Sequence, residues 1–158
     1  MKALTCFFIF SVATMGPVTA LGECPVTLPS SSPVAPSASE KSGWYGSEAL
    51  AVRLSPSGLW RGMGEEHNYG DKLWFWRRGF KAEYEPEPDL ILEGEKLSTT
   101  DGPRRLLITD AKSAFTPTWD RMLVGMEFPS PGCWKLLATY RNAGIAHDLT
   151  FVVNVVDD

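Results

Sequence analysis

Residues 128–134 read Phe-Pro-Ser-Pro-Gly-Cys-Trp, and this stretch separates two apolar runs that both have the character of β-strands. Pro129 and Pro131 fix φ and lack the N–H group that a continuing ladder would need. Gly132 permits the backbone dihedral angles of a tight return. We therefore expect the chain to turn here and to begin a new strand.

The segment after this turn, residues 133–140, alternates with the period of two that is typical of a half-buried strand. Trp134 and every second residue up to Tyr140 share one face of the expected strand, and Cys133 lies on the other face. The thiol of Cys133 should therefore point away from the core. In that position it can bond to a segment that lies across the outside of the sheet.

Length and composition describe one globular domain. The chain has 158 residues, of which 44% are hydrophobic and 22% are charged, and these are ordinary values for a folded protein. The formal net charge is −4, and it becomes one unit more negative without the first 20 residues, which hold one lysine and no acid. A surface of this sign repels phosphate backbones, so nucleic acid is not an expected partner.

Residues 1–20 predict a signal peptide. Lys2 supplies a short positive region, and residues 3–15 form an apolar run that is too short to span a membrane. Val18-Thr-Ala20 places small residues where signal peptidase requires them. The mature chain should begin at Leu21 and be exported to the periplasm or the extracellular space, the alternative being an N-terminal core helix.

Removal of the signal peptide leaves two cysteines, Cys24 and Cys133, in a compartment that permits oxidation. We expect them to form a disulfide, with free buried thiols as the alternative. A lipid anchor at Cys24 is disfavoured, because the lipoprotein peptidase needs a small residue where this chain has Glu23. No metal site and no cofactor are expected from these residues.

Residues 21–42 form a Pro/Ser-rich tail. Residues 25–42 hold four prolines and six serines and almost no large apolar group, so they bury too little surface to offset the entropy of ordering. The composition predicts a stiff, extended segment that runs along the outside of the domain, tethered by Cys24.

Residues 43–158 predict one all-β domain, because short strand candidates recur with turn signals between them. We expect a seven-stranded antiparallel Greek-key sandwich, with a small barrel of the same strands as the alternative and little or no helix. The last two strands should pair across the turn at Asn142-Ala-Gly144. The expected strands are 48–54, 73–78, 90–95, 104–109, 119–128, 133–140 and 149–156.

Several short motifs together resemble a family of small exported bacterial proteins to which no activity is assigned. The motifs are Cys24-Pro-Val-Thr, Trp44-Tyr-Gly, Lys72-Leu-Trp-Phe-Trp-Arg, Phe128-Pro-Ser-Pro-Gly-Cys-Trp134 and Leu149-Thr-Phe-Val-Val153. The paired cysteines and the Phe-Pro-x-Pro-Gly-Cys-Trp corner are the specific part. The resemblance implies an immunoglobulin-like domain and supplies no catalytic residue.

The expected strand at 73–78 carries aromatic side chains on both faces, which is more apolar area than one core can take. Its outward residues, Trp74 and Trp76, together with Arg77 and Arg78, are the candidate binding site. Three interpretations remain open: the tail covers the tryptophans, they form a platform for sugar rings or a peptide, or they bind a partner protein. The two arginines could stack on the rings or meet the acidic stretch 83–89.

No catalytic constellation is apparent. His67 and His147 lie far apart and stand in no catalytic motif, and the acidic residues of 83–89 lack the spacing of a calcium loop. The sequence therefore predicts a non-catalytic binding or interaction module of the bacterial cell envelope, whose partner is an unidentified envelope protein or glycan. An inhibitor-like or structural envelope protein is the alternative, and a hydrolase using Glu65, Glu66 and His67 is disfavoured.

Overall fold

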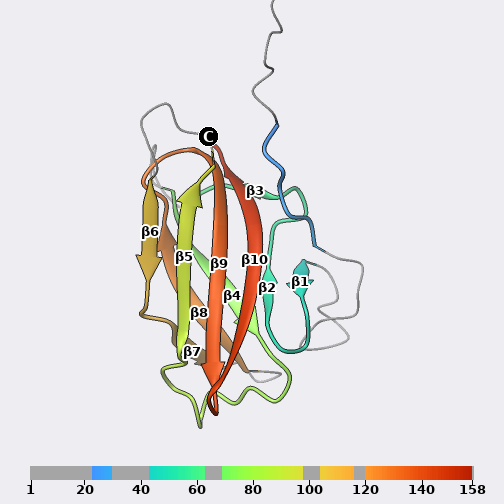
Figure 1. Cartoon of the computed structure of the whole chain (residues 1–158), viewed down its shortest axis with the longest axis vertical. Helices are drawn as coiled ribbons and strands as arrows, with labels where there is room; N and C mark the ends of the chain where they lie inside the picture. Colours follow the sequence, from blue (N-terminus) through green and yellow to red (C-terminus); the bar gives the residue numbers. More distant parts are fainter. Residues whose placement is uncertain (1–22, 30–42, 63–68, 98–103, 116–119, 158) are drawn as a thin grey trace, which may run out of the picture.

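The computed structural model describes residues 23–29, 43–62, 69–97, 104–115 and 120–157. Within these ranges the chain forms ten strands and no helix (Figure 1). The strands are β1 Trp44–Gly46, β2 Ala51–Arg53, β3 Leu59–Trp60, β4 Gly70–Trp76, β5 Leu90–Lys96, β6 Arg105–Ile108, β7 Lys112–Phe115, β8 Asp120–Glu127, β9 Gly132–Asn142 and β10 Ile145–Val155.

The strands make two five-stranded sheets that face one another as a β-sandwich. The first sheet has the order β1-β2-β4-β8-β7 and the second has the order β3-β10-β9-β5-β6. All neighbouring strands are antiparallel except β3, which pairs in parallel with β10. The expected all-β class is confirmed, whereas the expected count of seven strands is wrong for the described residues. The additional strands, β1, β3 and β7, have two to four residues each, too few to show a periodicity.

The turn at 128–134 lies where the sequence places it. Gly132 has a φ of 121°, a value that side-chain-bearing residues rarely adopt. The Nε1 atom of Trp134 donates a hydrogen bond to the carbonyl oxygen of Ser130 at 3.0 Å, so the indole itself closes the turn. The ring of Phe128 lies 5.4 Å from that of Trp134, which joins the turn to the core.

The long hairpin β9–β10 lies at the centre of the second sheet. Its register runs from Ile145 opposite Asn142 to Val155 opposite Gly132. The two residues between the strands, Ala143 and Gly144, have φ of 51° and 79°, which matches the turn that suits the twist of two-residue hairpins. The pairing expected across this turn is confirmed.

The core lies between the sheets and follows the expected alternation. Trp134, Leu136, Ala138 and Tyr140 of β9 are fully buried, while Cys133 on the opposite face is half-buried. Strand β4 likewise directs Leu73 and Phe75 inward. Each of these large side chains contributes several kcal/mol, since truncating a buried aromatic to alanine costs about 3 to 5 kcal/mol.

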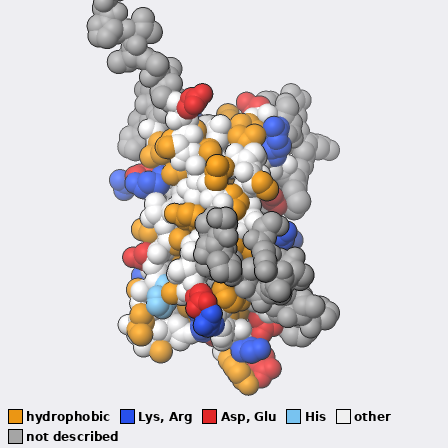
Figure 2. Space-filling view, turned by 90° about the vertical axis from the view of Figure 1, so that its right-hand side faces the viewer, with side chains coloured by type: hydrophobic (Ala, Val, Ile, Leu, Met, Phe, Trp, Pro, Cys, Tyr) orange, Lys and Arg blue, Asp and Glu red, His pale blue; other side chains and the backbone are white. Residues whose placement is uncertain are grey.

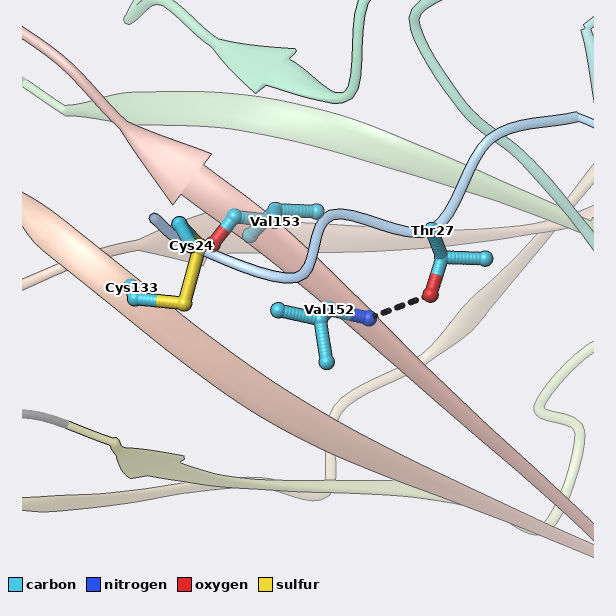
Figure 3. Close-up of a disulfide and its surroundings, with 5 residues drawn as sticks. All are labelled: Cys24, Thr27, Cys133, Val152 and Val153. Carbon is cyan, nitrogen blue, oxygen red and sulfur yellow. Dashed lines mark hydrogen bonds between the residues drawn. A yellow bond between two sulfur atoms is a disulfide. The ribbon is translucent and has the colours of Figure 1, made fainter. Parts of the chain in front are cut away.

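The tail is joined to the second sheet by the expected disulfide between Cys24 and Cys133, whose Cα atoms lie 5.4 Å apart (Figure 3). Thr27 then pairs with β10: its backbone N–H donates to the oxygen of Val152 at 2.8 Å. Its Oγ1 accepts from the N–H of Val152 at 2.9 Å (Figure 3). The tail therefore satisfies the backbone N–H and the carbonyl oxygen of Val152, which are the two hydrogen-bonding groups of this residue on this edge of the sheet.

Gly58 allows the tail to approach this edge closely. A Cβ atom at Gly58 would lie 2.6 Å from Cβ of Val26, and φ of Gly58 is 67°. The next amides along β10 are taken up by β3, since Asn154 donates to Gly58 and Val156 donates to Trp60. Thr27, Gly58 and Trp60 thus cover one edge of β10 in succession.

None of the described segments forms a helix long and apolar enough to cross a membrane.

Candidate functional site

The two candidate tryptophans lie on the outer face of the first sheet. On β4, Leu73 and Phe75 point into the core and are 2% and 0% exposed, whereas Trp74 and Trp76 point the other way and are half-buried. The expected division of this strand into two aromatic faces is therefore correct. We call the outward surface of Trp74, Trp76 and Arg121 the tryptophan face.

Arg121, from the neighbouring strand β8, supplies the cation of this surface. Its guanidinium carbon lies 4.5 Å from the ring centre of Trp74, and the residue is only 8% exposed. A guanidinium held over an indole is attracted by the ring, by about 0.5 to 2 kcal/mol depending on its desolvation. Arg121 and Trp74 are therefore joined by a cation–π contact across the two strands.

Arg121 is not among the site residues predicted from the sequence. Its signal was an arginine within a strand whose other residues are largely apolar. The cross-strand register then brings it beside β4, since Met122 lies opposite Phe75 and Leu123 lies opposite Trp74. That register cannot be read from either strand alone.

Arg77 belongs to a different environment, a polar network at the end of β4. Its Nε donates to the hydroxyl of Tyr140 at 2.8 Å, and an Nη donates to Glu85 Oε1 at 2.5 Å. Its guanidinium also lies over the rings of Tyr140, at 5.3 Å, and Phe80, at 5.9 Å. Of the two fates considered for Arg77, contact with the acidic stretch is the one observed.

Tyr140 is the centre of this network. Its hydroxyl donates to Glu85 Oε2 and accepts from Nδ2 of Asn142 at 3.0 Å. Burial, together with the hydrogen bond to Glu85, raises the pKa of Tyr140 above its usual value. The phenol is therefore protonated at neutral pH. The polar side-chain groups of Arg77, Glu85, Tyr140 and Asn142 bond to one another, so the network links three segments of the fold rather than offering a reactive group.

Arg78 is exposed and pairs with Glu48. An ion pair of this exposure contributes about 0 to 1 kcal/mol. The arginine that stacks on a ring of this face is Arg121, whereas Arg77 contacts Tyr140, Phe80 and Glu85, and Arg78 pairs with Glu48. The candidate residues are thus split by the structure into a tryptophan face and two separate ion pairs.

The acidic stretch 83–89 is occupied by protein cations. Beyond the contact of Glu85 with Arg77, Glu87 pairs with Lys112 at 2.9 Å. Asp89 pairs with Arg141 at 3.5 Å. The hydrogen bond from Lys112 lowers the pKa of Glu87. Among the described residues no group of three or more His, Cys, Asp or Glu side chains is placed to hold a metal ion.

The described part of the tail does not cover the tryptophan face. Residues 23–29 lie against β9 and β10 of the second sheet, and residues 30–42 lie outside the described residues. The described residues also exclude the disfavoured hydrolase candidates Glu65, Glu66 and His67. The other histidine, His147, lies within β10 opposite Tyr140. On the flank shown in Figure 2, charged side chains of both signs are scattered among hydrophobic ones.

Comparison of the chain with protein-family models, with curated proteins and with solved structures finds no match.

Proposed function

We propose that this chain is an exported, non-catalytic binding module of the bacterial cell envelope and that the tryptophan face is its contact surface. The observation that carries the proposal is the outward placement of Trp74 and Trp76 on β4, while the core takes its aromatic rings from the other side of the same strand. Large aromatic groups outside a core are typical of binding surfaces. The partner class is an envelope protein or glycan.

The geometry of Arg121 supports a preformed surface. Because Arg121 is buried against the Trp74 ring at 4.5 Å, this ring loses little freedom on binding, and a preordered side chain lowers the entropic cost of association. A flat indole face suits both sugar rings and apolar side chains. This is why both partner classes remain in the proposal.

We also propose an immunoglobulin-like topology for the sandwich. The order β2-β4-β8-β7 corresponds to the A-B-E-D sheet of such domains, and β10-β9-β5 corresponds to G-F-C. The parallel pairing of β3 with β10 fits a first strand that is divided between the two sheets. Folds of this kind serve many binding functions, so the topology supports a scaffold and not a particular ligand.

Export is part of the same proposal. The apolar N-terminal segment predicts it, and the disulfide between Cys24 and Cys133 is compatible with an oxidising compartment.

The test is retention of the mature protein on immobilised envelope fractions, one of glycan and one of protein. Trp76→Ala should abolish retention while changing the melting temperature by only a few degrees, because the ring is not part of the core. The matched control is Tyr84→Ala, which removes an aromatic group that is 76% exposed in another segment.

Three results would contradict the proposal. The first is undiminished retention of Trp76→Ala, and the second is an equal loss of retention with Tyr84→Ala. The third is a melting temperature more than about 10 °C below wild type for both Trp74→Ala and Trp76→Ala, which is the cost of truncating core aromatics.

A further inference from the structure

A cleft opens where the chain crosses from the first sheet to the second. Strand β2 pairs with β4 only through Ala51 and Val52, and the chain then leaves this sheet and reaches β3 in the other one. Beyond Val52 a cleft of about 300 Å³ lies between the departing chain and the start of β4. The cleft adjoins the tryptophan face, because Lys72 lies on the same side of β4 as Trp74, but neither tryptophan of that face lines it.

The rim of the cleft is cationic. Arg53, Arg61 and Lys72 line it and are all exposed, whereas Asp71 is the one acidic residue among its described lining residues. The Oδ1 atom of Asp71 accepts a hydrogen bond from the backbone N–H of Lys72 at 2.6 Å. The described lining residues therefore include three cationic side chains and one carboxylate, in a chain whose formal net charge is −4.

Arg53 and Lys72 lack the ion pair that most other cations in the described part of the chain make. The ion pairs there use Arg77, Arg78, Lys81, Lys112, Lys135 and Arg141. No described carboxylate pairs with the side chains of Arg53 or Lys72. Both line the cleft without a counter-ion from the described chain, so an anionic group in the cleft would have two cations to pair with.

The floor of the cleft is apolar and its near wall carries hydroxyl groups. Leu54, Leu73 and Val153 are buried lining residues, and Ser55 and Ser57, whose Oγ atoms hydrogen-bond to one another at 2.9 Å, also line the cleft. The volume is at the lower end of the range for small-molecule sites. An occupant should therefore be about the size of one sugar unit, with an apolar face for the floor, hydroxyl groups for the serines and a negative charge for the rim.

We propose that this cleft binds a negatively charged sugar unit, whose carboxylate or phosphate group lies between Arg53 and Lys72. Guanidinium groups suit carboxylate and phosphate alike, because both offer two oxygens to the guanidinium fork. The shared chemistry of the ligand is thus an anionic group on a sugar ring.

The test is an NMR titration of the folded, oxidised mature protein with four probes: glucuronate, glucose 6-phosphate, glucose and inorganic phosphate. Backbone amides of residues 53–61 and 71–73 should shift with at least one of the two anionic sugars at millimolar concentration. The anionic sugar that gives the larger shifts shows whether the cleft prefers a carboxylate or a phosphate group. Glucose should bind more weakly because it lacks the charge, and inorganic phosphate because it lacks the ring. Affinity should fall as salt is raised.

The double variant Arg53→Gln/Lys72→Gln should lower the affinity for the anionic sugar by about tenfold or more, because it removes both charged donors that would hold the anionic group. The matched control is Arg78→Gln/Lys112→Gln, which removes the same net charge from exposed ion pairs elsewhere. The control should bind like wild type.

Three outcomes would overturn the proposal. They are the absence of cleft shifts with both anionic sugars, equal shifts with glucose, and an equal loss of affinity in the control variant, which would indicate attraction by net charge alone.

Discussion

Removal of the disulfide with the double variant Cys24→Ala/Cys133→Ala should destabilise the protein substantially. The bond joins residues 109 positions apart, and the chain-entropy model gives a loop of this length about 4 to 5 kcal/mol. Measured losses for native disulfides are about 2 to 5 kcal/mol, so we expect a value within that range. At about 3 to 5 °C for each kcal/mol in a domain of this size, the melting temperature should fall by about 6 to 25 °C.

The structure also predicts which local contact is lost with the bond. Without it, Thr27 is no longer held against β10, so its hydrogen bonds with Val152 should break far more often. In wild type, Thr27→Val removes the hydroxyl acceptor and should cost about 1 kcal/mol. In the double cysteine variant the same change should cost almost nothing, because the contact is already open.

The assay is urea denaturation of the four proteins in this cycle, with amide hydrogen exchange of Val152 as the local probe. Wild type treated with a reducing agent is the control and should match the cysteine variant. The reasoning is refuted if the two cysteines can be alkylated in the unreduced protein. It is equally refuted if Thr27→Val costs the same with and without the disulfide.

Three further predictions concern other parts of the chain. Gly58→Ala should lower the free energy of unfolding, measured by urea denaturation, by about 1 to 3 kcal/mol, because it adds a clash with Val26 to an unfavourable φ. Gly79→Ala, with φ of 75° and open surroundings, is the control and should lower it by only about 1 kcal/mol. Equal losses in the two variants would contradict the close approach of the tail. The raised pKa of Tyr140 favours the folded state below its usual value near 10, and this contribution is lost as pH rises through the folded pKa. Tyr140→Phe should therefore be less stable than wild type at pH 8, with a smaller difference at about pH 11, and a constant difference would argue against it. Mass spectrometry of the native protein should find a chain that begins at Leu21, and a diacylated Cys24 would contradict this processing.

The sequence was sufficient for features that depend on local chemistry. Alternation in 133–140 predicts the buried face that ends at Tyr140 and the outward direction of Cys133, and both are observed. The turn signal at Asn142-Ala-Gly144 predicts the last hairpin, because Gly144 readily adopts the positive φ that the turn requires, whereas Ala143 adopts its positive φ less readily. The outward placement of Trp74 and Trp76 follows from the same period of two.

Features that depend on how distant strands meet could not be predicted. Strand β3 has two residues and exists because the chain crosses to the edge of β10, which no local pattern encodes. Arg121 reaches Trp74 through the register of β4 with β8. The cleft beside Arg53 likewise arises where two strands separate, so its lining comes from segments that have no common motif.

The position of the disulfide also has a consequence for the order of folding. Cys24 leaves the ribosome long before Cys133, because 109 positions separate them and synthesis runs from the N-terminus. The disulfide cannot form until almost the whole domain has emerged. Until then the edge of β10 at Val152 lacks its partner from the tail, and a strand of a neighbouring chain could pair with it. Yield of the monomer should therefore depend on how quickly an oxidant reaches the newly folded domain. Slow oxidation would favour association through that edge.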